Sequence, residues 1–202
     1  MAKVSRSLPI ALAGVLALAA CNKSASLGAP TTEDMALGNA AAKVTVAEYA
    51  SASCPHCAEF NNQVFQAFKA KYIDTGKVHY VFHEFLTPPV PFAAAGFLTA
   101  RCAGPGKYFD VLDAIYRQQE AIYKSGDFRG GLQRIAASTG MSDKQFSDCI
   151  SDDKALNALN KRVENAEKDG INSTPTFVIN GTKLEGEQSL EKLDAAIAAA
   201  NK

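Results

Sequence analysis

Two cysteines in the sequence Cys54-Pro55-His56-Cys57 constrain this chain more than any other feature. The preceding residues, Val44–Ala50, alternate as a β-strand does, and residues 60–72 have the apolar spacing of a helix. Pro55 would take the first helical position, where its fixed φ favours the start of a helix. A dithiol at a strand-to-helix turn predicts a redox site; a static disulfide or half of a metal site is the alternative.

The first twenty residues predict an export signal. Lys3 and Arg6 precede an uncharged apolar run from Leu8 to Ala20, which is short for a membrane span. Cys21 directly follows Leu18-Ala19-Ala20, and this sequence resembles a bacterial lipobox, in which the cysteine is lipidated. We therefore expect a lipoprotein-type signal peptide at 1–20, a lipid on Cys21, a flexible tether at 21–35, and a periplasmic location on a bacterial membrane. An ordinary cleaved signal is the alternative.

The composition fits one exported domain. A chain of 202 residues with 47% hydrophobic content can bury a proper core, with or without an insertion. The 21 basic and 21 acidic residues balance, and loss of Lys3 and Arg6 with the signal leaves a net charge near −2. Because no basic stripe or tail is visible, we expect no nucleic-acid partner.

The cysteine count supports export. The chain has five cysteines, an odd number. If Cys21 carries a lipid, four cysteines remain, and these can form two pairs in an oxidising compartment. Cys102 and Cys149 each lie on a predicted helix with apolar neighbours. They could form a structural disulfide, worth about 3–4 kcal/mol, or remain two buried thiols. Their spacing does not decide between the two.

The remaining elements predict an α/β fold with a helical insertion. Strands are expected at 43–49 and 78–85, parallel to each other because a helix from Cys54 to about Lys71 connects them. After the break at Thr87–Pro91, only helical runs follow, so we expect an insertion over about 89–169. Strands return at 176–179 and 182–184, joined by Asn180-Gly181, which is a strong hairpin signal. A last helix begins at Ser189, so residues 36–202 form one domain.

This order of parts resembles the thioredoxin fold and, more narrowly, the bacterial disulfide oxidoreductase A (DsbA-like) family. The resemblance covers roughly Met35 to Ala199. It rests on the Cys54-Pro55-His56-Cys57 motif, on the helical insertion between the second and third strands, and on Thr174-Pro175 before the last hairpin. The resemblance implies an acidic Cys54 thiol and an oxidising dithiol.

The resemblance also assigns roles to single residues. Cys54 would be the exposed nucleophile at a helix N-terminus, and Cys57 the resolving thiol. His56 would give the Cys54 thiolate a hydrogen bond or a positive charge. Pro175 would be a cis-proline beside the dithiol, rather than a trans-proline starting a strand, and Thr174 would pair with substrate and tune the potential.

Glu48 and two histidines have alternative interpretations. Glu48, six residues before Cys54, would be the family's buried acid that exchanges a proton with Cys57; otherwise it is an exposed acid on an edge strand. His79 and His83 point to the same side of one strand, which would suit a metal site. No further ligand cluster accompanies them, so we expect neither metal nor cofactor.

We therefore expect a thiol:disulfide oxidoreductase that donates the Cys54–Cys57 disulfide to reduced exported proteins through a mixed disulfide. The resemblance implies a DsbB-like, quinone-linked membrane partner that reoxidises the dithiol. The alternatives are a disulfide isomerase or reductase of the same fold, a non-catalytic lipid-anchored surface or binding protein, and a metallochaperone.

Overall fold

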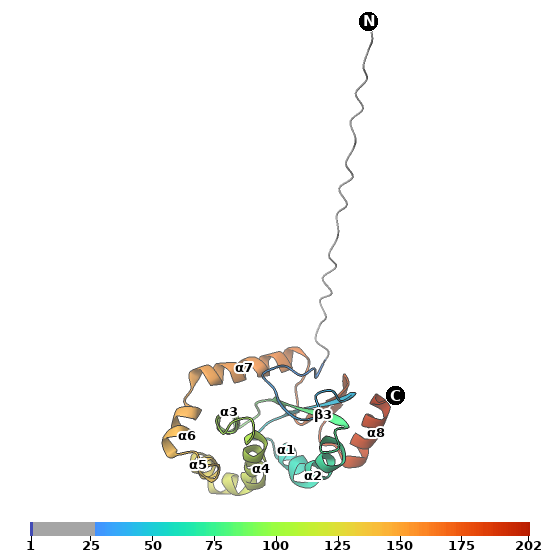
Figure 1. Cartoon of the computed structure of the whole chain (residues 1–202). Helices are drawn as coiled ribbons and strands as arrows, with labels where there is room; N and C mark the ends of the chain where they lie inside the picture. Colours follow the sequence, from blue (N-terminus) through green and yellow to red (C-terminus); the bar gives the residue numbers. More distant parts are fainter. Residues whose placement is uncertain (2–26) are drawn as a thin grey trace.

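The computed structural model describes Met1 and residues 27–202, in which a mixed five-stranded sheet forms the centre (Figure 1). The strands lie in the order β1-β3-β2-β4-β5. They are β1 (Met35–Gly38), β2 (Val44–Ala50), β3 (Val78–Glu84), β4 (Thr176–Ile179) and β5 (Thr182–Glu185). As predicted, β2 and β3 are parallel; every other neighbouring pair is antiparallel. β2 is therefore central, with hydrogen-bonded strands on both sides.

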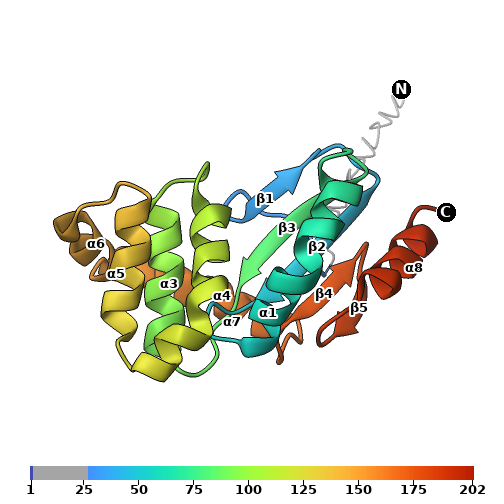
Figure 2. The same ribbon diagram turned by 90° about the horizontal axis from the view of Figure 1, so that it is seen from below.

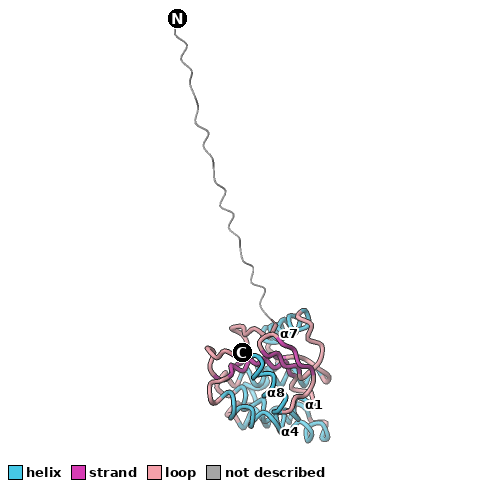
Figure 3. The backbone as a smooth tube through the Cα atoms, turned by 90° about the vertical axis from the view of Figure 1, so that its right-hand side faces the viewer, coloured by secondary structure: helices cyan, strands magenta, loops and turns pink. Residues whose placement is uncertain are grey.

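Helices cover both faces of this sheet (Figures 1 and 3). One face carries a continuous helix, 55–73, and the C-terminal helix α8, while α7 covers the other. The first consists of α1 (Pro55–Phe60), η1 (Asn61–Phe65), α2 (Gln66–Phe68) and η2 (Lys69–Ile73), and η1 and η2 have the wider turns of a π-helix. The predicted first helix is thus present and ends two residues later than expected.

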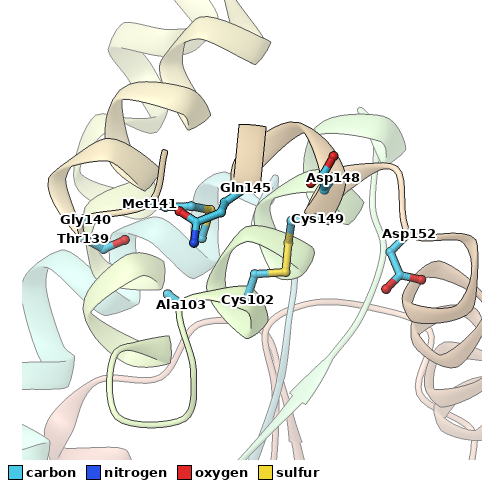
Figure 4. Close-up of a pocket in the computed structure, with 9 residues that line it drawn as sticks. All are labelled: Cys102, Ala103, Thr139, Gly140, Met141, Gln145, Asp148, Cys149 and Asp152. Atoms are coloured by element: carbon cyan, nitrogen blue, oxygen red, sulfur yellow. A yellow bond between two sulfur atoms is a disulfide. The ribbon is translucent and has the colours of Figure 1, made fainter. Parts of the chain in front are cut away.

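The predicted helical insertion comes between β3 and β4 in the sequence; most of it lies beside the sheet (Figure 2), and its last helix crosses one face (Figure 1). Its helices are α3 (Val90–Cys102), α4 (Tyr108–Ser125), α5 (Phe128–Ser138), α6 (Asp143–Ile150) and α7 (Asp153–Lys168); α8 (Leu190–Ala200) follows the sheet. Cys102 at the end of α3 is disulfide-bonded to Cys149 on α6, with Cα atoms 6.3 Å apart (Figure 4). The bridge that the sequence left open is therefore formed, beside a cavity of about 470 Å³.

A buried carboxylate joins the insertion to the sheet. The Glu84 side chain, at the end of β3, is fully buried. It accepts hydrogen bonds from Arg101 Nε on α3 (2.7 Å), Arg162 Nη2 on α7 (2.6 Å) and the Tyr108 hydroxyl on α4 (3.0 Å). Arg101 also donates to the Glu33 carbonyl at 3.0 Å. Four separate segments therefore meet at one charge.

The structure differs from the predicted tether at its C-terminal end. Met35 belongs to β1, an edge strand that was not predicted, because the short Met-Ala-Leu-Gly sequence lacks β-branched residues. Gly28 is buried with φ +73°, and a Cβ atom there would lie 2.9 Å from the Val178 Cβ. The segment from residue 27 is thus packed on the sheet. Cys21 and the predicted signal peptide lie outside the described residues.

Within residues 27–202, no helix combines the length and the apolar character that a membrane crossing needs.

Candidate redox-active site

Cys54 caps the N-terminus of α1, directly after the turn that follows β2. Its backbone is extended (φ −78°, ψ 121°), Pro55 takes the first helical position, and the Cys57 N–H points at the Cys54 sulfur at 3.4 Å. The strand-turn-helix arrangement predicted from the sequence is therefore present. Both thiols are free in this structure.

The Cys54 thiol is much less exposed than we expected. Cys54 is only 6% exposed, and Cys57 is completely buried. The segment at Thr174-Pro175 covers the sulfur: the Thr174 carbonyl lies 3.4 Å from Cys54 Sγ, and the Thr174–Pro175 peptide bond is cis. The structure thus brings together two motifs that are more than a hundred residues apart in the sequence.

The two thiols differ strongly in acidity. The pKa of Cys54 is lowered to about 6, chiefly by a hydrogen bond from the Cys57 thiol; burial opposes this, and Thr174 and backbone N–H groups add to it. The Thr174 hydroxyl is buried and unpaired among the described residues, so it can donate to a thiolate. Burial, together with Cys54, raises the pKa of Cys57 well above its usual value. Near neutral pH, Cys54 is thus ionised and Cys57 protonated.

The His56 side chain does not lie where we expected. It is 70% exposed, and its Nδ1 lies 3.7 Å from a carboxylate oxygen of Glu59 and 3.7 Å from one of Glu187. The group of His56 that helps to lower the pKa of Cys54 is its backbone N–H. The expected contact between the imidazole and the thiolate is therefore wrong for this structure.

Glu48 lies in the interior of the sheet. It is 3% exposed on the central strand β2, which rules out the alternative of an exposed acid on an edge strand. The Tyr80 hydroxyl donates to its carboxylate at 2.5 Å. Burial nevertheless raises the pKa of Glu48 to about 8, and the Glu48 charge in turn raises the pKa of Cys57. A carboxyl group that is protonated near neutral pH thus sits within electrostatic reach of the resolving thiol.

Three side chains of α4, none of them predicted, hold the turn before Cys54. Their donors reach three successive carbonyl groups, those of residues 51, 52 and 53. The bonds are Tyr116 Oη to Ser51 (3.3 Å), Gln119 Nε2 to Ala52 (2.9 Å) and Tyr123 Oη to Ser53 (2.7 Å). The spacing i, i+3, i+7 of these amphipathic residues was the available signal. The insertion thus helps to shape the active-site turn.

The structure gives no support to a metal site at the dithiol. His83 contacts Asp34 (Nδ1 to Oδ1, 3.1 Å) and stacks on Tyr49 instead. Over the described part of the chain, one group of side chains could gather round an ion, namely His56, Glu59 and Glu187, and it includes neither cysteine. All three are partly exposed, and we assign no metal to them.

A sheet of this topology, with a dithiol at the N-terminus of the helix that follows its central strand, is the arrangement of the thioredoxin fold. The family model described as thioredoxin matches residues 30–199. The chain belongs to the DsbA-like, thioredoxin-fold protein-disulfide oxidoreductase family.

Relatives of known sequence or structure agree with this assignment. The crystal structure of alpha-DsbA1 from Wolbachia pipientis has a TM-score of 0.77 at 30% identity, covering 85% of this chain and 92% of that one. A Rickettsia bellii protein, whose name provisionally assigns it to the protein-disulfide oxidoreductases, is 36% identical over 81% of this chain. The chain spans 63% of the length of that relative. Disulfide bond formation protein D of Bacillus subtilis is 23% identical over 80% of this chain and 74% of its own length.

Proposed function

We propose that the chain is an exported thiol:disulfide oxidoreductase that donates the Cys54–Cys57 disulfide to folding substrate proteins. The observation that carries this proposal is the lowered pKa of Cys54, about 6, at a buried helix N-terminus. A stabilised thiolate favours the reduced dithiol over the disulfide. The oxidised form therefore tends to pass its disulfide on.

The reaction begins on oxidised enzyme. A substrate thiolate attacks Cys54 Sγ, the Cys54–Cys57 bond breaks, and Cys57 leaves as a thiolate. Because Cys57 is buried and its pKa is raised, it takes up a proton, for which the protonated Glu48 carboxyl group is the donor. The second substrate thiolate then attacks the substrate sulfur of the mixed disulfide and releases Cys54 as a thiolate. Two electrons have passed from the substrate to the dithiol.

The segment at Thr174 and Pro175 would hold the substrate. The Thr174 backbone lies against the Cys54 sulfur, so an extended polypeptide paired with it would bring its own cysteine to that sulfur. The substrates proposed are reduced, unfolded exported proteins, and a DsbB-like membrane protein would accept the two electrons during reoxidation.

The proposed location is the periplasmic side of a bacterial membrane, with a lipid on Cys21. Support comes from the sequence: the charged start, the short apolar run and the small residues before Cys21. Mass spectrometry of the mature N-terminus tests this part, and an unmodified cysteine at position 21 would contradict it. The proposed oxidase activity does not depend on the outcome.

The equilibrium of the dithiol with glutathione tests the direction of the activity. We expect an oxidising dithiol, and faster oxidation of reduced ribonuclease than repair of scrambled ribonuclease. A potential as low as that of cytosolic thioredoxin would contradict the proposal, and preferential repair of scrambled ribonuclease would favour an isomerase. Cys54→Ser is the control, because it keeps the fold but removes the attacked sulfur.

A further inference from the structure

The His56 imidazole lies between two carboxylates from separate elements. Glu59 is on the same helix, three residues further on, whereas Glu187 is on the loop between β5 and α8. One atom from each of the three side chains lies within 4.8 Å of the other two. The imidazole therefore has a carboxylate neighbour on its own helix and another on a separate loop.

The loop that carries Glu187 is fixed next to the dithiol. The Gly186 N–H donates to the Pro175 carbonyl at 2.8 Å, which ties the loop to the segment that covers Cys54. Gln188, buried at 6% exposure, donates from Nε2 to the carbonyls of Glu185 (3.0 Å) and Gly186 (2.9 Å). These bonds hold Glu187 at the rim of the active site.

The pKa of Glu187 depends on both Glu59 and His56. Burial and the neighbouring Glu59 raise the pKa of Glu187, and His56 offsets part of this rise. Two adjacent carboxylates repel each other, and the imidazole Nδ1 lies 3.7 Å from an oxygen of each. The lowered pKa of Cys54, by contrast, is explained chiefly by Cys57, Thr174 and backbone N–H groups.

We propose that Glu187, together with Glu59, is a positioning residue that holds the His56 imidazole away from the Cys54 sulfur. Without this pair the imidazole could approach the thiolate, and the reduced dithiol would be more stable. The two carboxylates thus make the site less oxidising than the Cys-Pro-His-Cys motif alone would be. This inference deepens the proposed function: its relevance to disulfide donation rests on that function.

The test measures the glutathione equilibrium constant and the titration of the Cys54 thiolate absorbance near 240 nm. For Glu187→Gln, alone and with Glu59→Gln, we expect the equilibrium to move toward the reduced dithiol by about two- to fivefold, as partly exposed ion pairs allow. The thiolate titration should move to lower pH. In a His56→Ser background the same substitutions should produce less than half of this shift.

Two results would overturn the inference. A shift of equal size with and without His56 would mean that the carboxylates act on Cys54 directly, and no shift in either background would mean that they do not act at all. Glu164→Gln, the same charge change on α7, should leave the equilibrium unchanged, and urea unfolding checks that each variant is folded. If wild-type enzyme failed to oxidise substrates, the proposed function would fall while this comparison remained valid.

Discussion

Cys54 and Cys57 are the same residue type three positions apart, and their surroundings give them opposite protonation. Cys54 receives hydrogen bonds at a helix start, whereas Cys57 is enclosed one turn further on. Glu48, beneath them, has a raised pKa for the same reason as Cys57, namely burial. At the scale of single residues, the proposed chemistry therefore depends on which groups hold a proton at neutral pH.

The acidity of Cys54 can be measured by alkylation of the reduced chain. The rate of reaction with iodoacetamide should rise with a midpoint near pH 6, because the thiolate is the reactive form. In Cys57→Ala the midpoint should move to higher pH, because the main hydrogen bond to the thiolate is lost. A wild-type midpoint near 9 would contradict the assignment.

Glu48 should make stability fall as pH rises. Its pKa in the folded chain is about 8, above its ordinary value of 4.5, so the folded form keeps a proton that the unfolded form has lost. Between these two values the free energy of unfolding should decrease, by at most about 1.4 kcal/mol per pH unit. Urea unfolding of Cys54→Ser/Cys57→Ser, with and without Glu48→Gln, isolates this effect from thiol titration. If both proteins have the same pH dependence, Glu48 does not titrate as inferred.

Helix α4 connects the insertion to the chemistry at the scale of elements. It packs beside α1 and sends its tyrosine and glutamine donors to the turn that ends at Cys54. Backbone carbonyls in a buried turn have no neighbouring strand to bond to, so they need such side-chain donors. The insertion is therefore part of the active-site scaffold.

Tyr123→Phe should loosen this turn. Loss of the bond to the Ser53 carbonyl should cost about 0.5–1.5 kcal/mol and speed hydrogen exchange at the Cys54 amide. Tyr72→Phe is the matched control: it loses a hydroxyl bond to Asp194, so it should cost a similar free energy without changing exchange at Cys54. Equal exchange rates in the two variants would show that α4 does not hold the turn.

At the scale of the whole molecule, the Glu84 cluster fastens the insertion, the sheet and the N-terminal segment together. A buried carboxylate with two arginines tolerates the loss of one only at a cost, because its remaining charge is left less well compensated. Arg162 contributes two of the hydrogen bonds to Glu84.

Arg162→Met should lower the free energy of unfolding in urea by about 2–3 kcal/mol. The neighbouring Lys161→Met removes an exposed charge of the same sign, and should cost less than about 1 kcal/mol. Similar losses for the two variants would show that the Glu84 cluster contributes little to stability.

The sequence predicted the parts of the fold and site that depend on local signals. Asn180 and Gly181 both have positive φ, 44° and 86°, as their hairpin signal indicated. The position of the His56 side chain could not be predicted, because it depends on Glu187, which lies 131 positions further along the chain. The low exposure of Cys54 likewise could not be predicted, because it depends on the distant Thr174-Pro175 segment, which no local sequence pattern places next to Cys54.

The packing of the N-terminal segment has a consequence for access to the enzyme. Residues 27–30 lie beside Thr45 and Gly181, and Gly28 packs over Ala47 in the middle of β2, whereas the dithiol follows the end of that strand. Three strand residues separate Ala47 from Ala50, a distance of about 10 Å. Residue 27 is therefore anchored about half a strand away from the turn that leads to Cys54. An approach to the sulfur from beyond the end of β2 leads away from this packed segment.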